Sequence, residues 1–138
     1  MLNVSQLSLP TTGGGAIAKR FYPSNLFKLT PADVTSSYSV SAMTYDIGGQ
    51  TVAVISGCAI RASVGSGFDS NITLPSGIRP SAKQTIVGYT IDDRGSATDP
   101  SSGFPEVVTI DTGSIKLSDV FDGSNAKIVQ FEGVYLVD

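Results

Sequence analysis

Short runs of β-branched and aromatic residues, separated by glycine, proline and asparagine, recur along the last three-quarters of this sequence. They occupy residues 38–47, 51–63, 68–74, 83–91, 106–110, 114–117 and 127–137. Runs of this length between turn residues are typical of antiparallel strands, and none has the apolar spacing of a full helix. The sequence therefore predicts an all-β fold, an antiparallel sandwich or barrel, and of the two we predict an antiparallel β-sandwich of jelly-roll-like form.

Three local features add detail to this prediction. Gly48 and Gly49 separate two of the runs and predict a tight hairpin. The run at 51–63 is almost continuously apolar, which predicts a strand that is covered on both faces. Gly133 interrupts the last run and predicts a β-bulge.

The stretch LPSGIRPS, residues 74–81, places two prolines and a glycine around Arg79. Pro75 ends the preceding strand because it has no N–H for the ladder, and Gly77 permits a positive φ. Pro80 holds Arg79 in an extended conformation. We predict a rigid corner, with Arg79 held outward or across a subunit boundary.

Residues 1–35 differ from the rest of the chain. They contain three prolines and the triple glycine at 13–15, so we predict an irregular segment without full helices or strands. Apolar residues still occur there at a density that a disordered tail lacks. We predict an N-terminal docking arm over residues 1–35 and a β-sandwich head domain over 36–138. The arm's candidate docking residues are Phe21, Tyr22, Leu26, Phe27 and Leu29.

Composition excludes several classes of function. The 138 residues form one domain, with 15% charged residues and a net charge of −3. The nine Lys and Arg residues are scattered, so we expect no nucleic-acid partner. Cys58 is the single cysteine, which rules out an internal disulfide. The beginning of the chain lacks the pattern of a signal peptide and no run is long enough to span a membrane, so we expect no membrane insertion.

Catalytic chemistry has little support in the sequence. There is no histidine, the commonest general base and metal ligand. Acidic residues near Asp92 and Asp119 lack the spacing of a calcium loop and indicate solvated loop tips. Glu106 and Glu132 are the only glutamates, and nothing in the sequence brings them together. We expect a protein that is not an enzyme and that has no cofactor and no metal site.

Several segments carry a family resemblance as an ordered set. They are ISGCAI at 55–60, ITLPSGIRPS at 72–81, GYT at 88–90, VVTIDTGSIKL at 107–117 and VQFEGVYLV at 129–137. In this order they resemble the globular receptor-binding heads of bacteriophage fibre and baseplate proteins, and related virion surface (decoration) proteins. Unlike tail fibres, the sequence has no heptads, collagen-like repeats or extended shaft ahead of the head.

The resemblance implies a virion structural protein, assembled in the host cytoplasm, whose small β-sandwich forms a homotrimer. It implies that the arm contacts other virion proteins of the capsid, baseplate or tail, so we expect a chain without residues 1–29 to fold but not to attach. Two alternatives stay open: a capsid decoration or cement protein without receptor binding, and a stand-alone carbohydrate-binding module.

A head of this kind has host-surface saccharide as its possible ligand. Shallow sugar sites combine an aromatic face with fixed polar groups from loops. Tyr89 with Asp92, Asp93 and Arg94 at one predicted loop tip has this composition. These four residues are the candidate ligand-binding site.

Overall fold

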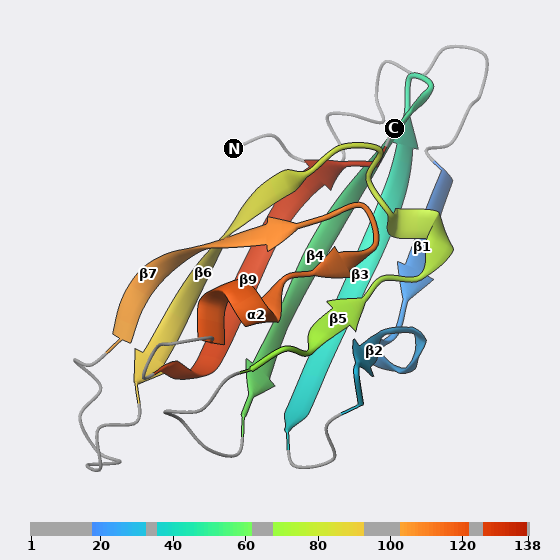
Figure 1. Ribbon diagram of the computed structural model, residues 1–138. Helices are drawn as coiled ribbons and strands as arrows, with labels where there is room; N and C mark the ends of the chain where they lie inside the picture. The colour runs from blue at the N-terminus through green and yellow to red at the C-terminus, as the bar shows by residue number, and fades with distance from the viewer. Residues whose placement is uncertain (1–17, 33–35, 62–67, 93–102, 122–125, 138) are drawn as a thin grey trace.

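The computed structural model describes residues 18–32, 36–61, 68–92, 103–121 and 126–137 (Figure 1). Its elements are β1 (Ala18–Tyr22), η2 (Ser24–Leu26), β2 (Lys28–Thr30), β3 (Ser37–Ile47), β4 (Gln50–Ile60), β5 (Asn71–Thr73), η3 (Ser76–Ile78), β6 (Gln84–Asp92), β7 (Gly103–Ile110), β8 (Ser114–Ile115), α2 (Leu117–Phe121) and β9 (Ala126–Leu136). Strands predominate and the described α-helix is a single short one, so the predicted all-β class is confirmed.

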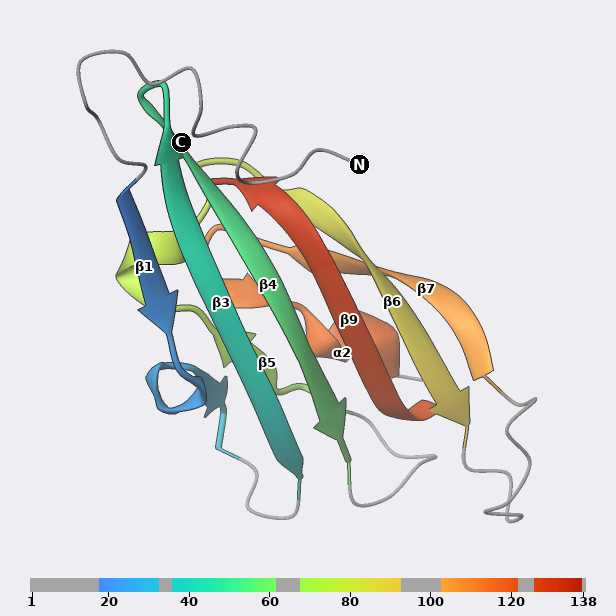
Figure 2. The same ribbon diagram turned by 180° about the vertical axis from the view of Figure 1, so that it is seen from behind.

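The strands form one antiparallel sheet in the order β1-β3-β4-β9-β6-β7-β8-β5-β2. β1, β3, β4, β9, β6 and β7 make a broad layer, which we call the long wall (Figure 2). The sheet curls so that β8, β5 and β2, together with α2, lie across the inner face of this wall (Figures 1 and 2). Ile110 of β7 pairs with Ile115 of β8, so the described strands form one continuous curled sheet and the predicted sandwich is not confirmed.

Part of the predicted arm belongs to this sheet. β1 pairs with β3, and β2 pairs with β5. Tyr22 and Phe27 are buried in the core, and the Tyr38 hydroxyl donates a 2.6 Å hydrogen bond to the Phe27 carbonyl. The prediction of an irregular arm is therefore wrong for residues 18–30, and residues 1–17 and 33–35 lie outside the described part. Tyr22 and Phe27 are core side chains, so the structure leads us to expect that a chain without residues 1–29 does not fold stably, in contrast to the expectation from the sequence.

The hairpin between β3 and β4 is confirmed, with φ of 58° at Gly48 and 85° at Gly49. Both glycines take the left-handed conformation that a two-residue hairpin of type I′ requires. β4 then alternates along its length: Ile55 is buried, whereas Val54 is exposed. The prediction that this strand is covered on both faces is wrong for the isolated chain, because no described element lies on the outer face of the wall.

Glycines of the long wall make room for large side chains on its inner face. Phe131 of β9 pairs with Gly57 on one side and with Gly88 on the other, and its ring approaches to 3.0 Å from where a Gly57 Cβ would lie. A Cβ at Gly133 would lie 2.5 Å from Cγ2 of Ile86. The register between β4 and β9 runs through Gly133 without a shift, so the predicted bulge there is wrong; the irregularity falls between Ile91 and Asp92.

The corner at residues 74–81 packs against the core through η3. The Tyr135 hydroxyl donates a 2.7 Å hydrogen bond to the Ile78 carbonyl, and Arg79 Nε donates a 2.9 Å bond to the Leu74 carbonyl. Gly77 is not among the positive-φ glycines, so that part of the prediction is wrong. Glycine is required for another reason: a Cβ at this position would collide with the Tyr22 hydroxyl.

Candidate interaction surface on the outer face of the long wall

The outer face of the long wall is unusually apolar for a surface. Because side chains alternate along a strand, each strand of the wall sends one set inward and one set outward. The exposed large apolar residues of the outward set are Phe21, Val54, Ile60, Val87, Tyr89, Val107, Val134 and Leu136. Figure 2 shows this face without any described helix or strand over it.

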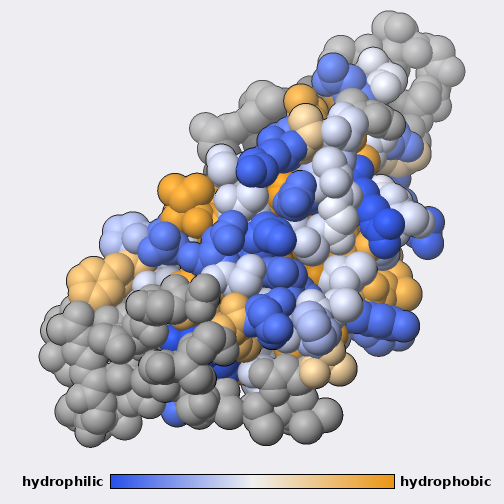
Figure 3. Space-filling view, viewed as in Figure 1, coloured by the Kyte–Doolittle hydropathy of each residue, from blue (hydrophilic) through white to orange (hydrophobic). Residues whose placement is uncertain are grey.

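The opposite side of the molecule has a different character. Figure 3 shows that hydrophilic residues gather over the centre of the side that carries the short strands and α2. Val87, on the outer face of the long wall, is by contrast 70% exposed and Val134 61% exposed. Large exposed apolar patches commonly mark interaction sites of soluble proteins. The outer face is therefore the candidate interaction surface of the described structure.

Two adjoining hollows occur on this face. The first, which we call the Tyr89 hollow, has a volume of about 360 Å³. It is lined by Val87, Gly88, Tyr89, Pro105, Gln130, Phe131 and Glu132. The second is more open, has a volume of about 590 Å³ and is lined by Val54, Ile55, Ser56, Val87, Glu132, Gly133 and Val134. Val87 and Glu132 line both hollows, so the two form one continuous depression over β4, β9, β6 and β7.

Charge is sparse on the outer face. Lys19 on β1 pairs across the sheet with Tyr45, and Glu132 on β9 pairs with Ser56 and with Val87. Among the described outward side chains of the long wall, these two are the charged ones, one of each sign. The carboxylate of Glu132 therefore emerges between neutral neighbours.

The sheet does not bring Glu106 and Glu132 together as a pair of carboxylates for acid–base catalysis. Glu132 pairs with Val87, whereas Glu106 pairs with the adjacent Gly88, so the two glutamates point to opposite faces of the sheet. The described residues contain no group of three or more His, Cys, Asp or Glu side chains placed to hold a metal ion.

Burial raises the pKa of Tyr135 well above its usual value, and the neighbouring Tyr22 raises it further. The Tyr135 phenol therefore stays protonated as a structural donor.

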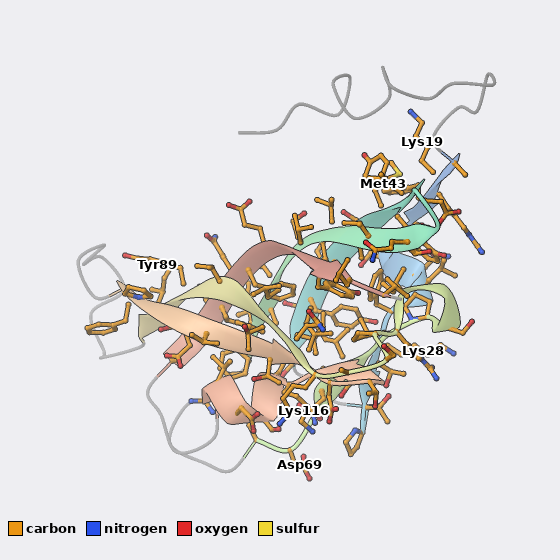
Figure 4. The ribbon with its side chains drawn as sticks, turned by 90° about the horizontal axis from the view of Figure 1, so that it is seen from above. Lys19, Lys28, Met43, Asp69, Tyr89 and Lys116 are labelled. Carbon is orange, nitrogen blue, oxygen red and sulfur yellow. The ribbon has the colours of Figure 1, made fainter. Side chains whose placement is uncertain are left out.

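The predicted ligand-binding residues are only partly described. Tyr89 is 42% exposed and lines the hollow that bears its name. Figure 4 places Tyr89 at the end of the wall opposite Lys19. Asp92 is the last residue of β6, but its side chain lies outside the described part, as do Asp93 and Arg94. The structure thus brings Tyr89 together with Gln130 and Glu132, which the sequence did not single out as ligand residues.

The predicted docking residues separate into two groups. Phe21 and Leu26 are exposed. Tyr22 and Phe27 are buried in the core of this chain, and Leu29 packs against that core. Burial of Tyr22 and Phe27 argues against a docking role for these two side chains, whereas for the partly buried Leu29 and for the exposed Phe21 and Leu26 the docking role stays a prediction.

We did not predict from the sequence that valines from several strands form one exposed surface. Val54, Val87 and Val134 lie on different strands, and only the register of the sheet brings them together. The signal in the sequence was the excess of apolar residues at both alternating sets of positions in the run 51–63, from which we predicted a strand covered on both faces.

Comparison with protein-family models, with curated protein sequences and with solved structures finds no match for this chain. Within the described ranges, none of the helices has the length and apolar character needed to cross a membrane.

Proposed function

We propose that this chain is a structural protein of a bacteriophage virion, a surface-exposed β head that associates as a homotrimer through the outer face of its long wall. The observation that carries this proposal is the exposed apolar face, with Val87 and Val134 more than half exposed. Burial of apolar surface is the main favourable term in protein association, at about 25 cal/mol per Å². An assembled particle keeps such a face covered.

The virion assignment is supported by the ordered motifs that resemble phage fibre and baseplate heads. In the structure, two of these motifs are linked: Tyr135 of the last strand donates its hydroxyl hydrogen bond to Ile78 in the LPSGIRPS corner. Both motifs therefore have a packing role in one core. In this proposal the residues that precede β1 in the sequence, together with the exposed Leu26 of η2, contact other virion proteins.

An alternative use of this face, binding of host-surface saccharide in place of a second copy, is favoured by the Tyr89 hollow. An exposed tyrosine ring next to the amide of Gln130 and the carboxylate of Glu132 supplies the apolar face and the polar groups that sugars require. A glycan array with the purified chain tests this function, with Tyr89→Ala as the control variant. Binding that Tyr89→Ala abolishes supports it, and an array without signal contradicts it.

The virion role is tested by immunogold electron microscopy of purified particles with an antibody raised against the full chain. We expect gold at a defined position on the particles: vertices, shell or tail tip. Particles without label, together with absence of the chain from their protein content by mass spectrometry, would contradict the virion role whatever the oligomeric state of the purified protein.

A further inference from the structure

If another molecule covers the outer face, the carboxylate of Glu132 loses its contact with water and needs a partner. A carboxylate that loses water without gaining a cation or equivalent hydrogen bonds is strongly destabilising. The cross-strand neighbours of Glu132 are Ser56 and Val87, and neither carries a charge. Whatever covers the face therefore has to bring a cation or several hydrogen-bond donors to this position, and a cation does so with one group.

Lys19, the outward-facing cation of the same chain, is too far from Glu132 to pair with it. Lys19 lies on β1, three strands from β9 in the sheet order, a separation on the order of 14 Å at the usual strand spacing. The two residues are also displaced along the strand direction. Across the sheet, Lys19 pairs with Tyr45, Tyr45 with Val52, and Val52 with Leu136. Leu136 is four residues from Glu132 on β9, which adds roughly 13 Å. Lys19 and Glu132 of the same chain cannot pair across this span.

Lys19 is nevertheless presented for contact with another molecule. β1 is the edge strand of the sheet, and both Lys19 and Phe21 are exposed. The two residues are two positions apart, so they point to the same side of the strand. Figure 4 shows Lys19 near Met43 at one end of the wall and Tyr89 at the other. One end therefore carries a cation with an aromatic ring, and the other end carries a hollow with a carboxylate.

We propose that Lys19 and Phe21 of one copy dock into the Tyr89 hollow of a second copy of this chain. The Lys19 ammonium pairs with the Glu132 carboxylate, and the Phe21 ring packs against Val87 and Tyr89. This inference rests on the self-association in the proposed function and names its contact residues. Each copy has one such donor end and one such acceptor end, so every copy makes both contacts in a closed ring.

Charge complementarity is the reason to assign a second copy as the occupant. The described outer face holds one cation, on the edge strand β1, and one carboxylate, three strands away on β9, so the cation of one copy complements the carboxylate of the next copy in the ring. A saccharide would satisfy Gln130 and Glu132 but would leave Val54 and Val134 exposed. A second copy covers the hollow and these valines together.

Charge reversal and charge exchange test the proposal. Native mass spectrometry and light scattering are applied to the full-length wild type, Lys19→Glu, Glu132→Lys and the double variant. We expect an oligomer for the wild type, monomers for both single variants because like charges meet at the contact, and an oligomer again for the double variant. Lys28→Glu and Glu106→Lys are matched controls, because both side chains are exposed but neither lies on the outer face; both should leave the oligomer intact.

The other outcomes overturn the proposal in distinguishable ways. An oligomer that persists in both single variants overturns this contact but leaves self-association standing. A monomeric wild type overturns both, and if that monomer binds a saccharide in a Glu132-dependent manner, the hollow is a sugar site. Where a reversal prevents folding, Lys19→Gln and Glu132→Gln replace it, with weaker association expected for each. Immunogold labelling of particles reports on the virion role independently.

Discussion

The two faces of the long wall are built from the same strands but are packed in opposite ways. On the inner face, Phe131 fits between Gly57 and Gly88, and Ile86 occupies the space beside Gly133. On the outer face, Val87, Val107 and Val134 have no described side chain packed over them. Because alternate residues of one strand face opposite sides, the inner set can specify the fold while the outer set serves contact with other molecules.

The largest expected effect on stability comes from a substitution at the centre of the inner face. Phe131→Ala removes a buried ring that is flanked by two glycines, which leaves a cavity that the backbone cannot fill. We expect a loss of about 3–5 kcal/mol in the free energy of unfolding, measured by urea denaturation. Gln130→Ala, the exposed neighbour on the same strand, is the control and should change stability by less than about 0.5 kcal/mol. Equal effects of the two substitutions would contradict the distinction between the faces.

A second prediction concerns the space next to Ile86. In Gly133→Ala, the new methyl group meets Cγ2 and Cβ of Ile86 at 2.5 and 2.6 Å, so side chain or backbone has to move. We expect a destabilisation of about 1–3 kcal/mol. Gly113→Ala is the matched control, because nothing lies within 4 Å of its new methyl group. A Gly133→Ala variant as stable as Gly113→Ala would show that the close approach at Gly133 is not required.

A third prediction concerns the link between the last strand and the corner. Tyr135→Phe removes the hydrogen bond to the Ile78 carbonyl, at a cost of about 1 kcal/mol at neutral pH. Burial raises the Tyr135 pKa, so the folded chain keeps this proton at pH values where the unfolded chain, with an ordinary tyrosine pKa near 10, has lost it.

The stability that this proton provides is complete below pH 10 and is lost as the pH rises above it. The loss is about 1.4 kcal/mol per pH unit for one proton. Urea denaturation of the wild type and of Tyr135→Phe on both sides of pH 10 measures it. The wild type should lose stability more steeply than the variant. Parallel pH profiles would contradict the buried, protonated phenol.

The smallest effect on the folded chain is expected on the outer face. Val134→Ser, introduced into the Lys19→Glu background so that self-association does not contribute, should change the free energy of unfolding by less than about 0.5 kcal/mol. In the wild-type background the same substitution should weaken the oligomer, as measured by light scattering across a dilution series. A Val134→Ser variant that destabilises the monomer strongly would place Val134 in the fold, not at a contact.

Much of the fold could be predicted because its signals are local. The Gly48–Gly49 turn requires left-handed backbone, and the alternation of β5 placed Ile72 and Leu74 on the buried side. The failures involve partners that are distant in sequence. Glycine at position 77 is explained by the hydroxyl of Tyr22, and glycine at 133 by Ile86. No pattern along the chain reveals such a neighbour.

The strands of the predicted arm and the residues of the candidate site also depend on partners that are distant in the sequence. β1 and β2 are too short for a periodic signal, and pairing with β3 and β5 is what makes them strands. Tyr89 was selected for its residue type, but Gln130 and Glu132 join it only through the pairing of β6 with β9. The charges at Lys19 and Glu132 become complementary only once the sheet order is known.

The central claim is that the outer face of the long wall is covered by another copy of the chain. Cys58, the single cysteine, is half-buried in β4 and lies opposite Gln130 on this face, one strand from the Tyr89 hollow. Its rate of reaction with a maleimide is compared between the wild type and Lys19→Glu, whose substitution is remote from the thiol. If another copy covers this face, the wild type should react more slowly than Lys19→Glu, and dilution should remove the difference. Equal rates at every concentration would contradict it.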